Sequence, residues 1–123
     1  MEPLTYTTLY TGFDGKTHCK DEALPWHPVA NVATEPLYVA PLQDATHIGF
    51  LYSPVGRTTD WHPALRKQCV MVLTGSMGVE AGDGEKRTFT PGSVLLVTDV
   101  DGMGQKTRGG GDQAVLLVWV PLP

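Results

Sequence analysis

The sequence predicts an all-β domain, folded as a barrel or a sandwich of short strands. Three observations lead to this fold class. No apolar repeat of helical period extends beyond one turn anywhere in the 123 residues. Short strand-like runs recur instead, separated by turn signals. Glycine (14) and proline (10) are abundant together, which favours many turns. We therefore expect less than about one tenth of the chain to be helical.

Seven runs have the composition of strands. The first, residues 5–11, is rich in Thr and Tyr, and the others are residues 46–52, 68–74, 77–81, 87–90, 93–98 and 113–120. Residues 82–84, Gly-Asp-Gly, suit a tight hairpin because glycine accepts positive φ. Residues 90–92, Thr-Pro-Gly, fix one φ angle and free the next. The three glycines at 109–111 form a hairpin tip, and residues 12–36 are expected to be an irregular arm.

Two of these strands are apolar on both faces, at residues 70–73 and 115–119. A barrel wall that faces water alternates apolar and polar residues. Both faces of these strands must therefore be covered, by another sheet, by the N-terminal segment or by a second subunit. The excess of apolar wall leads us to expect a homodimer.

Length and charge narrow the class of protein. The length suits one domain, which we divide into an N-terminal arm with the first strands (1–45) and a barrel core (46–123). The net charge is −4 and basic residues occur only in pairs, so we expect no nucleic-acid partner. No run is apolar enough for a membrane span or a signal peptide, so we expect no membrane partner. Cys19 and Cys69 are then expected to be reduced thiols of a cytoplasmic protein.

The segment between residues 56 and 75 has the spacing of a known signature. Its fixed positions are Gly56, His62, Ala64, Gln68 and Gly75, which follow the pattern G-x5-H-x-H-x3-E-x6-G with two ligand positions changed. In this the chain resembles the cupin superfamily. The resemblance implies a cupin-type jelly-roll β-barrel whose interior binds a small organic molecule.

Further segments extend this likeness over nearly the whole chain. Residues 91–97 are similar to the start of the second cupin signature, and residues 99–105 to a glycine loop that ends in a metal-binding His. The chain is most similar to a branch of small single-domain cupins. That branch shares the patterns found here at residues 10–18, 61–68, 91–96, 99–105 and 120–123.

The metal-ligand positions of the family are mostly lost in this chain. The resemblance places His62, Ala64, Gln68 and Gln105 where three His and one Glu are expected. Alanine cannot ligate, and an amide oxygen is a weaker donor than a carboxylate. We therefore expect no cofactor. If a divalent metal is bound, His62, Gln68 and Gln105 would hold it, with His47 as a further candidate.

His62 and Gln68 are the candidate catalytic residues. An imidazole with a pKa near about 6.5 can exchange a proton at neutral pH. The Gln68 amide can donate a hydrogen bond to a developing oxyanion. The candidate substrate-binding residues are Trp61, Val70, Val72, Gln105 and His47.

Each of these residues also has a purely structural interpretation. His62 can be a turn histidine held between its neighbours, and Gln68 a hydrogen-bonded interior residue. Trp61 suits the rim of a pocket better than its wall, and Gln105 suits a solvated loop position. Strand alternation offers a check: Gln68, Val70 and Val72 should face the interior, and residues 69, 71 and 73 the outer side.

Two main functions remain open. The first is an enzyme that performs acid/base chemistry on a carbonyl-containing metabolite: isomerisation, cyclisation, dehydration or decarboxylation in a biosynthetic step. An isomerase, cyclase or lyase fits the ligand count better than an oxygen-activating dioxygenase. The second is a non-catalytic module that binds a small molecule. A metal-dependent cupin with a non-standard ligand set is a third, weaker possibility.

Overall fold

The computed structural model of the chain describes residues 5–29 and 37–123, and all of its regular elements are strands. These are β1 (Thr5–Thr11), β2 (Thr17–Ala23), β3 (His27–Val29), β4 (Leu37–Val39), β5 (Gly49–Ser53), β6 (Gln68–Thr74), β7 (Ser76–Glu80), β8 (Lys86–Phe89), β9 (Val94–Val97), β10 (Lys106–Gly110) and β11 (Val115–Pro121). Within those residues no helix is long and apolar enough to cross a membrane. The predicted all-β class is confirmed.

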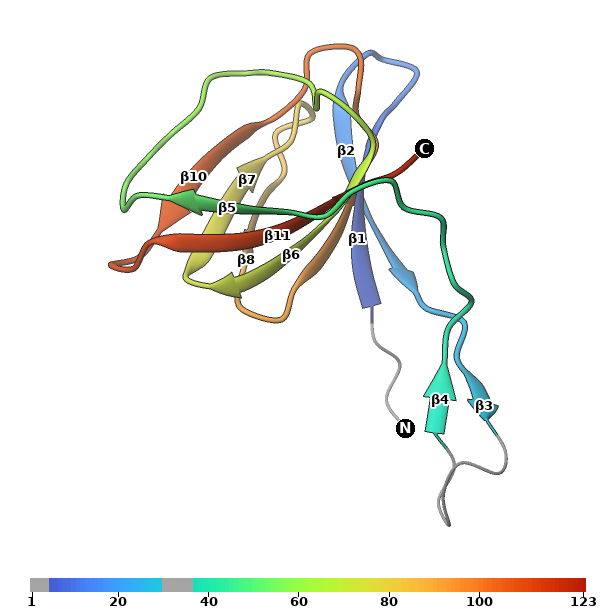
Figure 1. The fold of residues 1–123 in the computed structure, drawn as a ribbon. Helices are drawn as coiled ribbons and strands as arrows, with labels where there is room; N and C mark the ends of the chain where they lie inside the picture. The colour runs from blue at the N-terminus through green and yellow to red at the C-terminus, as the bar shows by residue number, and fades with distance from the viewer. Residues whose placement is uncertain (1–4, 30–36) are drawn as a thin grey trace.

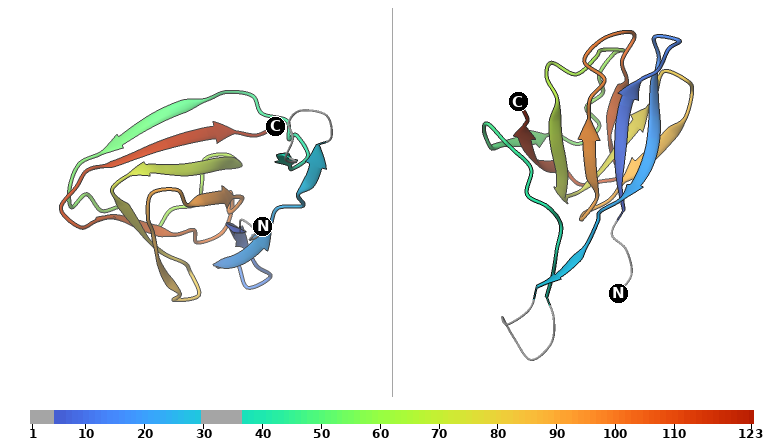
Figure 2. Two further views of the ribbon diagram at one scale, coloured as in Figure 1. Left: turned by 90° about the horizontal axis from the view of Figure 1, so that it is seen from below. Right: turned by 90° about the vertical axis from the view of Figure 1, so that its right-hand side faces the viewer.

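Two sheets form the walls of the barrel. The larger has six strands in the order β2-β1-β9-β6-β11-β5, and the smaller has three in the order β10-β7-β8. Figures 1 and 2 show the sheets facing each other, with β6 leading directly into β7 through a turn at Gly75. A Cβ atom at residue 75 would lie 2.4 Å from the Ala114 carbonyl oxygen, so the turn requires glycine.

The core lies between the two sheets. Leu9, Val70 and Leu95 contribute from the larger sheet, and Val79 and Phe89 from the smaller. Leu9, on β1, is 1% exposed, so the core includes residues that precede position 46. As predicted, residues 82–84 form a turn between β7 and β8, and residues 90–92 form a turn between β8 and β9. Gly84 and Gly92 have positive φ in these turns.

The expectation of an irregular arm at residues 12–36 is wrong for most of the described part, residues 12–29, of which ten lie in strands. Residues 17–23 form β2, which pairs with β1 along seven residues of an antiparallel hairpin. Thr7 and Thr8 donate hydrogen bonds across this hairpin to Asp21 and Glu22. The polar composition of β2 does not indicate a strand, because these cross-strand contacts, and not apolar side chains, stabilise it.

Beyond β2, the strand β3 pairs with β4 in a separate two-stranded ribbon. This ribbon projects away from the barrel on the side where β1 begins (Figures 1 and 2). Residues 30–36, the rest of the expected arm, lie outside the described residues.

The remaining strands follow their predicted limits closely, with two exceptions. The strand expected at 46–52 begins only at Gly49 and ends at Ser53. The strand β10 (Lys106–Gly110) occupies a segment for which no strand was predicted, because its glycines indicated only a turn.

Candidate functional site

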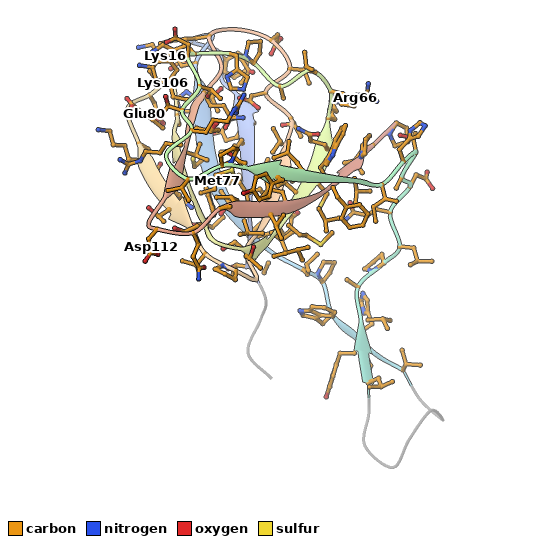
Figure 3. All side chains as sticks on the ribbon, turned by 60° about the vertical axis from the view of Figure 1, so that its left-hand side comes forward. Lys16, Arg66, Met77, Glu80, Lys106 and Asp112 are labelled. Atoms are coloured by element: carbon orange, nitrogen blue, oxygen red, sulfur yellow. The ribbon has the colours of Figure 1, made fainter. Side chains whose placement is uncertain are left out.

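The barrel encloses a cavity of about 490 Å³. Its walls are the inward-facing side chains of both sheets, among them Leu9, Val70, Met77, Val79, Leu95, Val97, Val115, Leu117 and Trp119. Figure 3 shows Met77 between the two sheets. A chamber of this size, apolar with a few polar groups, has the dimensions of a small-molecule site.

One side of the cavity is bordered by what we call the rim: the loop of residues 54–67 and the segment of residues 98–105. Figure 1 shows the first of these arching from the end of β5 to the start of β6. His62 and Gln105 face each other across the rim in an antiparallel bridge. The His62 amide donates to the Gln105 carbonyl at 3.0 Å, and the Gln105 amide donates to the His62 carbonyl at 2.9 Å.

A glycine makes this bridge possible. Gly104 has a φ of +81°, and a Cβ atom there would lie 2.0 Å from the carbonyl carbon and oxygen of His62. The two segments can therefore approach only because residue 104 has no side chain. Next to the bridge, the Ala64 amide donates to the Asp99 carbonyl at 2.8 Å and holds the same two segments together.

The imidazole of His62 is oriented by the backbone. Its Nδ1 lies 2.8 Å from the Asp60 carbonyl oxygen. A carbonyl oxygen only accepts, so Nδ1 carries the hydrogen and donates it. In the neutral ring Nε2 then holds the lone pair. His62 is exposed at the rim and lines the cavity, so Nε2 is available to a bound molecule.

Gln68 and Gln105 supply amide groups to the same cavity. Gln68 opens β6 and is half-buried, whereas Gln105 is only 7% exposed. The Gln105 Oε1 is buried and has no hydrogen-bond partner among the described residues. A buried acceptor that is left unpaired costs stability.

The alternation expected along β6 is observed. Val70 and Val72 are buried on the inner side, and Gln68 and Val70 line the cavity. Val72 is packed in the core, away from the cavity lining. Leu73 is exposed on the outer side.

The structure places three of the expected substrate-binding residues away from the cavity lining: Val72, as described above, Trp61 and His47. Trp61 is half-buried at the rim, and the Lys106 ammonium lies 5.0 Å from the centre of its ring. His47 is exposed and precedes β5 instead of lying on it. Gln105, for which a solvated loop position was the alternative, is buried instead.

Several residues of the site were not foreseen. Trp119 lies against Gly49, where a Cβ atom would come within 2.4 Å of the indole nitrogen. Arg57 and Arg66 line the cavity from the rim. Trp119 could have been found from the sequence, because it lies two positions from Leu117 on a strand that contributes to the interior. No pattern in the sequence marked the arginines.

Asp99 is a buried carboxylate behind the rim. It is fully buried, and its Oδ2 accepts a hydrogen bond from the Thr17 hydroxyl at 2.8 Å. Its Oδ1 has no partner among the described residues. Burial raises the pKa of the Asp99 carboxyl above its usual value, although the bond from Thr17 opposes the shift. This residue positions the backbone of the rim and does not line the cavity.

The residues at the positions where the resemblance led us to look for metal ligands do not fit a metal ion. One imidazole, a methyl group and two amides stand there, at positions 62, 64, 68 and 105. Among the described residues no three His, Cys, Asp or Glu side chains come together as ligands. First-row divalent ions need imidazole, thiolate or carboxylate donors for firm binding. We therefore assign no step of the chemistry to a metal.

Comparison with solved structures shows the same fold in other proteins. A cupin 2 conserved barrel domain protein from Salinispora arenicola CNS-205 superposes with a TM-score of 0.53 at 14% identity, covering 81% of this chain and 76% of that one. The cupin domain of Schizosaccharomyces pombe Cnp3 gives a TM-score of 0.52 at 11% identity, covering 100% of this chain and 86% of the other. No family model and no curated protein matches this sequence. At these identities the likeness shows the fold, which is a cupin-type β-barrel.

Proposed function

We propose that the chain binds a small carbonyl-containing molecule inside the barrel and that His62 moves a proton on it. The observation that carries this proposal is the orientation of the His62 ring. Its Nδ1 is held by the Asp60 carbonyl, which leaves Nε2 as a base at the rim of an apolar cavity. A base oriented in this way needs no reorganisation before it accepts a proton.

The simplest reaction that this arrangement supports is removal of a proton from the carbon next to a carbonyl group. The C–H bond breaks, its hydrogen moves to His62 Nε2 as a proton, and the electron pair moves to the carbonyl oxygen. The resulting enolate oxygen is negatively charged, and an amide hydrogen of Gln68 or Gln105 can stabilise it. Return of the proton to another atom completes an isomerisation. A dehydration is completed when a hydroxyl group on the next carbon takes the proton from His62 and leaves as water.

Deuterium exchange tests this proposal without knowledge of the natural substrate. The protein is incubated in D₂O with 2-oxo-4-phenylbutanoate and with 4-phenylbutan-2-one, and proton NMR follows deuterium entering next to the carbonyl. We expect exchange above the buffer rate, and we expect His62→Gln to lower it by about 10²–10⁴-fold. The matched control is His47→Gln, because His47 is exposed outside the cavity lining.

If the His62→Gln variant exchanges deuterium as fast as the wild type, His62 does not take part in the reaction. If both compounds bind but neither exchanges, the second function, a binding module without catalysis, is favoured.

We also propose that the chain forms a homodimer through the outer face of β5, β11 and β6. Phe50 and Tyr52 are 74% and 66% exposed there, beside the exposed Leu73 and Leu116. The strand β5 is also an edge of the six-stranded sheet, so one side of its backbone has no partner strand within that sheet. An apolar face that adjoins an open edge is self-complementary under a two-fold axis.

Sedimentation equilibrium tests the dimer against the 13.3 kDa mass of one chain. We expect twice this mass at micromolar concentration, and the monomer mass for Phe50→Lys. The control is Phe13→Lys, because Phe13 is fully exposed on the β1–β2 turn. A monomeric wild-type chain would contradict the proposal.

A further inference from the structure

We infer that the ligand of this cavity is an organic anion with an apolar body. This inference rests on the proposed function, because it names the class of molecule that the cavity takes. It is carried by the charges around the cavity.

No Asp or Glu lines the cavity among residues 5–29 and 37–123. The whole chain has 13 acidic residues against 9 basic ones, so a carboxylate would be expected on an average surface of this size. Three acidic residues belong to the rim itself, and none of them lines the cavity. Asp60 lines a hollow on the outer face of the smaller sheet, Asp99 is fully buried, and Asp101 is exposed outside the cavity lining.

The charged side chains that line the cavity are cations. Arg57 and Arg66 both line the cavity and both are exposed. Neither forms a salt bridge with any acidic side chain in the described part of the chain. Figure 3 shows Arg66 on the loop that leads into β6, at the edge of the barrel and far from the small sheet that carries Glu80 and Lys106. A guanidinium that has no carboxylate partner can turn onto a bound oxyanion.

Arg108 is not counted among these cations, although it borders the cavity. It pairs with Gly78, and a Cβ atom at residue 78 would lie 2.8 Å from the Arg108 Nε. The Arg108 side chain therefore lies over Gly78. This is the outer face of the smaller sheet, because the neighbouring Met77 and Val79 point inward. The outer hollow of about 580 Å³ there also contains Asp60 and Glu80, so its charges are mixed.

The cavity lining combines charge, hydrogen-bonding groups and apolar surface. Arg57 and Arg66 come from near the two ends of the loop of residues 54–67, Gln68 and Gln105 add amide groups, and the two sheets supply aliphatic and aromatic walls. An anionic group held by either arginine would leave the apolar body of the molecule against the walls of the barrel.

Calorimetric titration with matched compounds tests the inference. The probes are 4-phenylbutanoate, the uncharged 4-phenylbutanamide and 3-phenylpropyl phosphate, which share one apolar body. We expect the carboxylate or the phosphate to bind about ten-fold more tightly than the amide at low salt, and the tighter of the two identifies the head group. The advantage should shrink as salt is added, because the rim is exposed to solvent.

Variants of the two arginines test which positive charges bind the anion. Arg57→Gln and Arg66→Gln should each weaken binding of the preferred anion by about three- to ten-fold and leave the amide unchanged. The matched control is Lys67→Gln, which removes one positive charge from the same loop at a residue that does not line the cavity.

The outcomes separate the two proposals. If the amide binds as tightly as the anions, or if Lys67→Gln weakens anion binding as much as Arg66→Gln, the anion inference is wrong and the cavity remains a small-molecule site. If none of the three compounds binds, the cavity is not a ligand site of this kind, and the proposed function fails together with the inference.

Discussion

Replacement of Gly104 by alanine tests how the candidate site is assembled. The new methyl group would lie 2.0 Å from the carbonyl of His62, at a residue whose φ is +81°. The left-handed backbone alone costs a non-glycine residue roughly 1–2 kcal/mol. The overlap then either persists as strain or separates the two segments and breaks the two backbone hydrogen bonds between His62 and Gln105. Each route costs roughly 1–3 kcal/mol more.

We therefore expect Gly104→Ala to lower the free energy of unfolding by about 2–5 kcal/mol. The control is Gly84→Ala, because Gly84 also has positive φ but no atom lies within 4 Å of its Cβ position. Gly84→Ala should lose only the roughly 1–2 kcal/mol that the left-handed backbone costs a non-glycine residue. The loss of chain entropy in the unfolded state is common to both variants and cancels.

Urea denaturation at one protein concentration measures both variants, since dimerisation makes stability depend on concentration. Gly104→Ala should also weaken binding of 4-phenylbutanoate, because His62 and Gln105 move. The reasoning would be refuted if Gly104→Ala were no less stable than Gly84→Ala.

Two further predictions concern pH. The His18 ring lies between Asp14 and Asp83, at 2.9 Å from each, and the hydrogen bond to Asp14 is the main cause that raises the pKa of His18. A raised pKa stabilises the fold below the unfolded value of about 6.5, and this stabilisation is lost as pH rises through the folded value. The stability advantage of the wild type over His18→Gln should thus be present at pH 6 and decline towards pH 9 in thermal melts; an advantage independent of pH would contradict this. Burial raises the pKa of Asp99, so its ionisation costs stability as pH rises above the unfolded value of about 3.9. Asp99→Asn should therefore gain stability relative to the wild type between pH 3.5 and pH 7, and a relative loss over that range would show that the carboxylate is favoured where it lies.

The strands that could be predicted from sequence are those whose own residues decide their structure. The strands β1 and β6 begin and end at the predicted residues, because Thr, Tyr and Val favour extended backbone and turns bound both runs. By contrast, β2 contains Lys, Asp and Glu. Its pairing depends on hydroxyl–carboxylate bonds to β1, and a single-strand pattern cannot show such a partner.

The residues of the candidate site also fall into those that the sequence could predict and those that it could not. Alternation along one strand predicts that Gln68 and Val70 face the interior. That His62 and Gln105 belong to one site was indicated only by the resemblance to cupins. The orientation of His47 could not be predicted, because the start of β5 depends on its pairing with β11. The arginines at the rim were missed because a loop residue carries no periodic signal of the direction in which its side chain points.

The most direct test of the central claim is the nitrogen-15 NMR spectrum of the histidine rings during titration with 4-phenylbutanoate. The His62 signals are assigned by their loss in His62→Gln. In the free protein near pH 8 the neutral ring should be the tautomer with hydrogen on Nδ1, as the bond to the Asp60 carbonyl requires. On titration the Nε2 signal of His62 should shift and saturate at the calorimetric binding constant, while His47 stays unchanged. If the ligand binds and the Nε2 signal of His62 does not move, His62 does not face the bound molecule and the proposed site is wrong.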